Sequence, residues 1–378
     1  MIPLFKPSLG KEELTNLEQV FNTGYITLGP KTKEFEERFA AYVGTPYAVG
    51  TSSCTIALQM ALDVLKVKGG EVCVPPLTFV STVTAAVYNQ ATPVYVDVDP
   101  DTLCMDPADL EKKITKKTKA IIPVHYGGHP CDMDRILAIA KAKNIPVLED
   151  CAHTGGAYYK NKQTGSFGDM GCFSFHAVKP LAAGDGGMVT THNENYARQL
   201  GSLRWLGASK DTYQRDKKGY DWYYEISCLG YKGYMNDITA AIAMAQLEKL
   251  ESMNERRRKI ADLYNEAFKG LDWLKTPVIR SYAKSSHHNY ATKIDTERIS
   301  RDDFMEHLKS NGISSGVHYM PIYQHPYYRV EDPRTPVAES VWQKIVLLPL
   351  FSSMTESEIQ QVIDAVTGYA KIKKTISV

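Results

Sequence analysis

The sequence predicts an α/β protein, with a large domain built on a mixed, mainly parallel sheet and a smaller α+β domain after it. Strand-like and helix-like segments alternate over residues 50–192, which is typical of a parallel sheet covered by helices. A long helical pattern then begins at Asn236 and contains no proline or glycine before Gly270, and such a helix can connect two domains. We therefore expect a large domain at residues 1–250 and a small domain at residues 251–378.

In the large domain, each element is expected from the spacing of its apolar residues. Helices are expected where apolar side chains recur every three or four positions, at residues 51–66, 79–89 and 132–144. Runs rich in Val and Ile are expected as buried strands, at residues 71–75, 93–98, 118–125, 145–150, 170–176 and 188–191. Thr51, Ser52 and Ser53 are candidate caps of the first helix.

The small domain is expected from a second set of segments. These are a strand at residues 288–295, a helix at 301–311, a strand at 312–319 and a terminal helix from Glu356. Between the two sets, residues 209–231 are polar and aromatic without clear periodicity, so we expect a long loop there. Loops of that length in compact proteins tend to be functional or disordered.

Composition excludes several classes of protein. Arg and Lys total 44 against 43 for Asp plus Glu, and a net charge of +1 gives no electrostatic case for binding nucleic acid or an anionic membrane. The first residues lack the basic and apolar regions of a signal peptide, and no apolar run approaches the roughly 20 residues that span a bilayer. We expect a cytoplasmic protein with no nucleic-acid or membrane partner.

The seven cysteines include no C-x-x-C pair. An odd, scattered set suits reduced thiols better than disulfides or a zinc site, so we expect packing residues and no metal. They are Cys54, Cys73, Cys104, Cys131, Cys151, Cys172 and Cys228.

Lys179 is the strongest candidate for chemistry. It follows a strand-like segment and precedes Pro180 and the glycine-rich run at residues 184–187, and Asp150 ends an upstream strand. This is what a pyridoxal phosphate (PLP) enzyme requires, since the amine holds the cofactor aldehyde as a Schiff base and the carboxylate keeps the pyridine nitrogen protonated. A lone lysine after a strand is more often a surface residue, so the surrounding pattern has to decide.

Three neighbouring motifs each allow two interpretations. Residues 50–55 open a helix and offer amides and hydroxyls for a phosphate, or simply cap the helix. Phe79 lies at the next strand-to-helix turn, where its ring could stack on a planar cofactor or pack in the core. The glycines at residues 184–187 lack the spacing of a dinucleotide site and more plausibly permit a turn close to a ligand.

In their order along the chain, these elements resemble the nucleotide-sugar aminotransferases of the DegT/DnrJ/StrS family, which are fold-type I PLP enzymes with an aspartate-aminotransferase-like large domain. The resemblance runs from residues 24–30 to the end of the chain. Its motif segments are residues 78–82, 91–99, 122–128, 149–153 and 174–187. Within the family, the chain looks most like the branch that aminates UDP-linked 4-keto sugars.

The resemblance implies a role for each motif. Lys179 forms the Schiff base, Asp150 pairs with the pyridinium nitrogen, His153 lies near the phenolic oxygen of the ring, and Phe79 stacks on it. Thr55, the amide of Ile56, and Ser174 match positions that hold the phosphate. The full set expected around the cofactor is Ser53, Cys54, Thr55, Ile56, Phe79, Asp150, His153, Ser174, Lys179, Lys232 and Asn236.

The family's sugar-site segment matches His318, Tyr323 and His325, although a histidine in an aromatic segment is as often a packing residue. In one respect the chain departs from the family, in which an asparagine reaches the PLP phosphate of the neighbouring subunit. Tyr234 stands in its place, so the contact has moved to Lys232 or Asn236, or is lost. The resemblance still implies a homodimer.

The resemblance implies amino transfer from glutamate to a nucleotide-linked keto sugar. A sugar dehydratase of the same family would carry histidine in place of Lys179, and an idle regulatory protein would not need Asp150, His153 and Lys179 together. A nicotinamide dehydrogenase lacks support because no G-x-G-x-x-G follows an early strand. Basic residues of the long loop could bind the diphosphate, although a solvated basic loop is the commoner case: Lys210, Arg215, Lys217 and Lys218.

Overall fold

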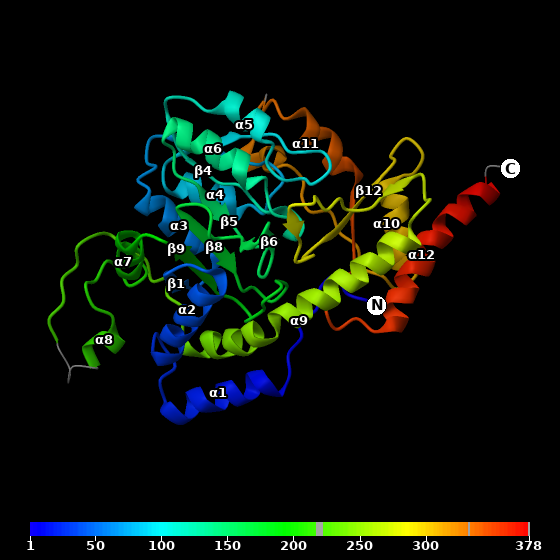
Figure 1. Cartoon of the computed structure of the whole chain (residues 1–378). Helices are drawn as coiled ribbons and strands as arrows, with labels where there is room; N and C mark the ends of the chain where they lie inside the picture. Colours follow the sequence, from blue (N-terminus) through cyan, green and yellow to red (C-terminus); the bar gives the residue numbers. More distant parts are fainter. Residues whose placement is uncertain (217–221, 332, 377–378) are drawn as a thin grey trace.

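The computed structural model describes residues 1–216, 222–331 and 333–376. It has a larger and a smaller body, and the long helix α9 (Asp237–Ala267) runs from one to the other (Figure 1). The larger body holds a sheet wrapped by helices, so the expected α/β class is confirmed.

The central sheet is assembled from two sets of strands. One set has the order β1 (Tyr47–Thr51), β9 (Gly187–Thr191), β8 (Met170–Ser174), β5 (Leu148–Asp150), and the other has the order β3 (Thr92–Tyr95), β2 (Glu71–Val74), β4 (Thr118–Ile121). Parallel bridges from Ile121 to Val147 and from Val124 to Asp150 join the two sets. Among these strands β9 alone runs antiparallel to its neighbours, which confirms a mixed, mainly parallel sheet.

The larger body also contains helices, several of which pack on this sheet. They are α1 (Lys11–Thr23), α2 (Pro30–Val43), α3 (Cys54–Val64), α4 (Ser81–Tyr88), α5 (Pro107–Lys113), α6 (Met133–Lys143), α7 (Glu194–Leu203) and α8 (Thr212–Asp216). A small sheet of β11 (Ala283–Lys284), β6 (Tyr158–Tyr159) and β7 (Lys162–Gln163) and the short 3-10 turn η1 (Tyr126–Gly128) complete it. The helix expected from residue 51 starts later, because Thr51 belongs to β1 and Ser53 is the N-cap.

The smaller body packs helices on an antiparallel sheet. Its elements are β10 (Leu274–Lys275), β12 (Tyr290–Ile294), β13 (Ile345–Leu348), α10 (Arg301–Ser310), α11 (Pro336–Val341), α12 (Glu356–Ile376) and the 3-10 turns η2 (Ile322–Gln324), η3 (Pro326–Tyr328) and η4 (Trp342–Lys344). The strand expected at residues 312–319 is wrong, since only single bridges form there, from Ile313 to Ile2 and from Gly316 to Leu347. Glycines weaken a strand, and the fully buried β13 takes the sheet position instead.

Helix α9 contributes to the hydrophobic cores of both bodies. Leu250 and Met253 pack with the core of the larger body, whereas Ile260 and Tyr264 pack with that of the smaller one. The domain boundary predicted at residue 250 falls within this helix and stays a prediction. In the described part of the chain, no helix combines the length and the apolar character needed to cross a membrane.

The cysteines are all free, and six of them are buried. Cys228 is exposed, so its expected packing role is wrong. It lies in the segment at residues 209–231, where a long loop was expected and where the short helix α8 also forms.

A buried ion pair fixes β1 to the helices beside it. The guanidinium of Arg204 contacts the carboxylate of Glu36 and also donates from Nη1 to the carbonyl of Gly50 (2.8 Å). Glu36 in turn accepts from the amide of Gly50 (2.8 Å). Burial alone would raise the pKa of Glu36, but Arg204 and Lys33 hold it below its usual value. These contacts connect the end of β1, which precedes Ser53, to Glu36 of α2 and to Arg204 at the end of α7.

We expect Arg204→Met to lower the free energy of unfolding by about 3–5 kcal/mol at pH 7, because it leaves Glu36 as a buried, unpaired charge. Urea unfolding measures this loss. The loss should shrink as the pH falls through about 4, where Glu36 of the unfolded chain takes up a proton. The control is Arg38→Met, which breaks exposed pairs with Glu34 and Glu248 and should cost within about 1 kcal/mol. Equal losses in the two variants would contradict the prediction.

Candidate active site

A cavity of about 430 Å³ opens at the carboxyl ends of β5 and β8, beside the N-terminus of α3. Ligands of open α/β sheets bind at such strand ends. The cavity brings together most of the residues expected from the sequence: Ser53, Cys54, Thr55, Phe79, Asp150, His153, Ser174, Lys179 and His318. The smaller body and the N-terminal segment complete its wall.

Lys179 lies in the loop that follows β8, and its amide donates to the carbonyl of His176 (2.9 Å). Among the described residues, none accepts a hydrogen bond from its side-chain amine, although the amine lines the cavity. Burial lowers the pKa of Lys179 to about 8, against a smaller opposing effect of Cys54 and Asp150. A larger fraction of the amine is therefore neutral near pH 7 than for an ordinary lysine, as a nucleophile requires.

The glycine run after Lys179 allows two backbones to approach closely. Gly184 and Gly186 have φ of +88° and +121°, a region that favours glycine. A Cβ on Gly187 would lie 2.6 Å from the amide nitrogen of Cys54, so no larger residue fits. The glycine run therefore places the loop that carries Lys179 against the start of α3. This agrees with the expectation that these glycines permit a tight turn.

Asp150 ends β5 with its carboxylate at the cavity. Its Oδ2 accepts from the Thr82 hydroxyl (2.8 Å) and its Oδ1 from the amide of Ala152 (3.1 Å). Burial raises the pKa of Asp150, and these hydrogen bonds and Lys179 only partly offset it. A cationic partner in the cavity would restore the charged form of this carboxylate.

His153 is held as a neutral ring. Its Nδ1 accepts from the amide of Gly127 (3.3 Å), so the ring proton lies on Nε2, which donates to the Tyr319 hydroxyl (3.2 Å). Burial lowers the pKa of His153 well below its usual value, and Lys179 and His318 lower it further. His153 can therefore donate a hydrogen bond at this wall without carrying a charge.

Hydroxyl groups gather where α3 begins. Ser53 accepts from the amide of Ile56 (3.3 Å) as the N-cap, the hydroxyls of Thr55 and Ser81 are hydrogen-bonded (2.7 Å), and Ser174 lines the same cavity. A helix N-terminus with hydroxyl groups beside it favours an anion. The amide of Ile56 donates to Ser53, and the side chain of Ile56 packs against the core.

Sequence reasoning missed several residues that line the cavity, and four of them bear on the site. Ser81 lies inside the 78–82 motif and Tyr319 follows His318, so both could have been found from neighbouring residues. Phe5 and His288 come from the N-terminal segment and the smaller body, and no local pattern indicates their position. Phe79 keeps 57% of its surface exposed at the cavity, 6.3 Å between ring centroids from Tyr319.

Two residues expected in the sugar site do not line this cavity within one chain. Tyr323 is buried in the core, where its hydroxyl bonds Thr335 (2.8 Å) and its ring packs on Tyr95. Within this chain, Tyr323 therefore packs in the core and does not reach the cavity where a substrate contact was predicted. His325 is exposed at the end of η2, because the two short 3-10 turns direct the segment along the surface.

The residues proposed for a cross-subunit contact also lie outside the cavity. The amine of exposed Lys232 is 3.9 Å from the Trp205 ring centroid, and Asn236 caps α9 by accepting from the amide of Thr239 (2.9 Å).

Of the basic loop residues expected near a diphosphate, Arg215 stacks on Tyr224 at 5.0 Å, and Lys210 donates to the carbonyl of Tyr223 (3.3 Å). Lys217 and Lys218 lie outside the described residues.

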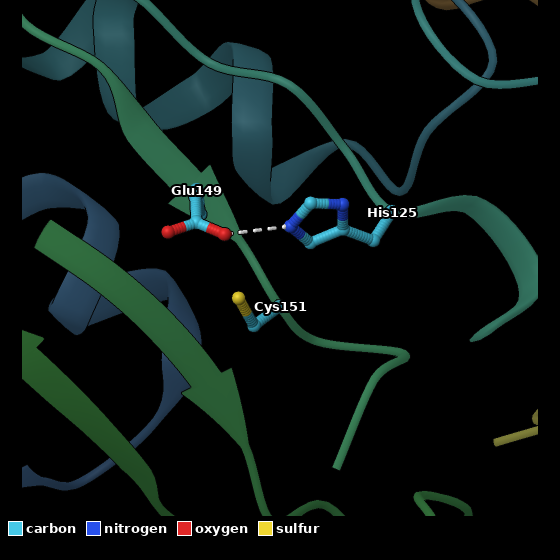
Figure 2. Close-up of side chains that lie close together, drawn as sticks. All are labelled: His125, Glu149 and Cys151. Atoms are coloured by element: carbon cyan, nitrogen blue, oxygen red, sulfur yellow. Dashed lines mark hydrogen bonds and ion pairs between the residues drawn. The ribbon is translucent and has the colours of Figure 1, made fainter. Parts of the chain in front are cut away.

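Beneath the cavity, the fully buried pair of His125 and Glu149 lies beside Cys151 (Figure 2). The amide of Cys131 donates to Nδ1 of His125 (3.0 Å), so Nε2 donates to Oε2 of Glu149 (3.1 Å). Glu149 also accepts from three loop amides at 2.8–2.9 Å: Gly165, Phe167 and Gly168. These bonds already engage the ring nitrogens of His125 and the carboxylate of Glu149, so we interpret the group as support for the site.

Known proteins share both the fold and the extent of this chain. The aminotransferase TlmJ of Streptoalloteichus hindustanus has a TM-score of 0.92 and 31% identity, covering 99% of this chain and 100% of its own. Spr1654 of Streptococcus pneumoniae, classed as a sugar aminotransferase and solved in its PLP-form, has a TM-score of 0.89 and 33% identity over 96% of this chain and 97% of its own. The spore coat polysaccharide biosynthesis protein SpsC of Bacillus subtilis is 39% identical over 98% of this chain and 97% of that protein.

This chain thus has the fold of solved sugar aminotransferases. The DegT/DnrJ/EryC1/StrS aminotransferase family matches residues 7–367, and the chain belongs to it. The family expected from the motifs is confirmed.

We expect substitutions of two adjacent carboxylates to have opposite effects on the cofactor-free protein. Glu149→Gln should lower the free energy of unfolding by about 2–3 kcal/mol, because its amide group must face another donor. Asp150→Asn should raise it at pH 7, because a carboxyl group whose pKa is raised by folding destabilises the protein above its unfolded pKa of about 3.9. This gain should vanish below about pH 4.

Urea unfolding at pH 7 and pH 3.5 measures both variants. A loss of stability in Asp150→Asn as large as that in Glu149→Gln would show that Asp150 also serves the fold.

Proposed function

We propose that the protein is a PLP-dependent aminotransferase that converts a nucleotide-linked keto sugar to the amino sugar, with glutamate as donor. The observation that carries this proposal is that Lys179 and Asp150 face one cavity at the strand ends. Membership of a sugar aminotransferase family supports it.

The residues present fit PLP. The amine of Lys179 is available for an aldehyde, Asp150 is a carboxylate whose buried charge lacks a cationic partner within bonding distance, and Thr55, Ser81 and Ser174 offer hydroxyls beside a helix N-terminus. When bound, PLP supplies an aldehyde that takes up the amino group and a ring that accepts electrons.

In this proposal Lys179 has two tasks. Its Nζ would hold the cofactor between turnovers. Once glutamate has displaced it, the same nitrogen would move a proton from the Cα of the donor to the cofactor, and in the second half-reaction it would move a proton from the cofactor to the acceptor carbon. A pKa near 8 suits both tasks, because an acid–base group works best near the operating pH. Since one cavity receives donor and acceptor in turn, we expect ping-pong kinetics.

Asp150 and His153 would orient and hold the cofactor ring, which is the group that accepts electrons. The Asp150 carboxylate, whose direction is fixed by Thr82 and the amide of Ala152, would keep a proton on the pyridine nitrogen. His153 donates from Nε2 and stays neutral, so it adds a hydrogen bond but no competing charge. Tyr319 receives that hydrogen bond and joins the smaller body to the cavity.

We further propose a homodimer. Lys179 is the one cationic side chain among the described residues that line the cavity. The cofactor phosphate, the glutamate carboxylates and a nucleotide diphosphate carry several negative charges, and such charges are bound by arginine, lysine or amide donors. A second copy of the chain would supply them, and the exposed Lys232 is the first candidate.

The substrate is proposed as a UDP-linked 4-keto sugar. This choice rests on resemblance to the 4-keto branch through residues 125–128 and the segment of His318 and His325. A dehydratase of the same family, which would carry histidine in place of Lys179, and an idle protein of the same fold are the alternatives.

We expect borohydride treatment of the yellow holoenzyme to attach the cofactor to Lys179, because that amine reaches the cavity beside Asp150. Peptide mapping by mass spectrometry identifies the labelled lysine. Lys179→Ala should still bind PLP without a covalent link and transfer no amino group. The exposed Lys160→Ala is the control and should keep the label and the activity. A label on another lysine would refute the assignment.

Initial rates with glutamate and a panel of UDP-, dTDP- and GDP-linked 4-keto sugars, together with a 3-keto sugar, identify the acceptor. We expect the UDP-linked 4-keto sugar to have the highest kcat/KM. Preference for another nucleotide or for the 3-keto sugar would overturn the substrate and leave amino transfer in place. Elimination of a hydroxyl without amino transfer would favour the dehydratase.

A further inference from the structure

The N-terminal segment, residues 1–6, forms part of the cavity wall although it is distant in sequence from every other lining residue. In Figure 1 the chain starts beside the smaller body and crosses to α1. The amide of Ile2 donates to the carbonyl of Gly312 (2.7 Å), and the carbonyl of Ile2 accepts from the amide of Ser314 (3.0 Å). Ile2 is itself buried in the core of the smaller body, so the segment is anchored rather than loose.

This anchoring brings Phe5 to the cavity. Its ring stacks on His288, with 5.1 Å between ring centroids and 15° between planes, and on His318, with 5.9 Å and 16°. The Phe5 side chain is partly exposed and lines the cavity.

The wall around Phe5 is aromatic and uncharged. His288 lies 4.5 Å from His153 between ring centroids, and His318 stacks on Tyr319 at 4.8 Å. Burial lowers the pKa of His318 to about 4 and that of His288 well below its usual value, and Lys179 adds to both effects. Neither of these two histidine rings therefore carries a positive charge near pH 7 that would attract a carboxylate.

The cavity therefore has two chemically different sides. Asp150, Thr55 and Ser174 form the polar side, which suits the cofactor. The wall around Phe5 offers an aromatic surface and neutral ring nitrogens, which suit the C–H face and hydroxyls of a sugar ring better than the two carboxylates of glutamate.

We propose that Phe5 is a specificity-determining residue that packs against the sugar ring of the amino acceptor. The proposal rests on the proposed function and extends it, since it assigns the acceptor to the wall made by the N-terminal segment. Phe5 contributes to acceptor binding and has no part in cofactor binding or in the half-reaction with glutamate.

Phe5→Ala and Phe5→Leu test the proposal. The acceptor is the nucleotide-linked 4-keto sugar that the unaltered enzyme turns over fastest in the panel above. Phe5→Ala should raise the KM for this acceptor roughly tenfold, as loss of an apolar contact does, with kcat within about twofold. Phe5→Leu keeps most of the apolar surface and should recover most of the affinity.

Two further readouts separate binding from structure. The rate of the glutamate half-reaction, followed by the cofactor absorbance in the absence of acceptor, should stay within about twofold of the unaltered enzyme. Phe21→Ala, an equal truncation on the exposed face of α1, is the control and should change neither KM nor the half-reaction. Thermal unfolding of each variant reports its folding.

The outcomes are distinguishable. Amino transfer with an unchanged KM in Phe5→Ala overturns the role of Phe5 alone. Equal loss in both half-reactions, or loss of the cofactor absorbance, also overturns it, since Phe5 would then serve the fold of the site. Failure of the unaltered enzyme to transfer an amino group to any acceptor overturns the proposed function and this inference together.

Discussion

The geometry of the cavity depends on the burial of Glu149. Its carboxylate accepts hydrogen bonds from His125 and from the amides of Gly165, Phe167 and Gly168, and none of it is exposed. Because successive residues of a strand point to opposite faces, fixing Glu149 on one face of β5 directs Asp150 to the other. His125 extends the support to η1, where the amide of Gly127 sets the proton position of His153.

Burial at the cavity disfavours charge on every group that would do chemistry. The pKa of Asp150 is raised, and those of Lys179 and His153 are lowered. In each case desolvation is the largest cause of the pKa shift. Without a ligand, each group is therefore charged less readily in the cavity than it would be in water. A ligand that pairs with Asp150 would relieve this cost, and part of its binding energy would appear as stability.

The parts of the site that were predictable from the sequence lie in short, continuous motifs. Asp150 ends a strand, Lys179 follows one, and Ser53 and Thr55 open a helix, so local patterns placed all four near strand ends. Phe5 and His288 reach the cavity through tertiary packing, and no pattern in their own segments indicates it. Tyr323 and His325 show the reverse, since a motif marked a segment whose backbone turns these two side chains away. The failed strand at residues 312–319 has a similar cause, because pairing depends on partners elsewhere in the chain.

Helix α9 has a further consequence for how the protein unfolds. Its residues Leu250 and Met253 belong to one hydrophobic core and Ile260 and Tyr264 to the other, within about four turns of the same helix. If either core unfolded, α9 would lose its packing contacts with that core. The other core packs on the same helix and would be destabilised as well. The two bodies should therefore melt as one cooperative unit, with a single calorimetric transition in place of two.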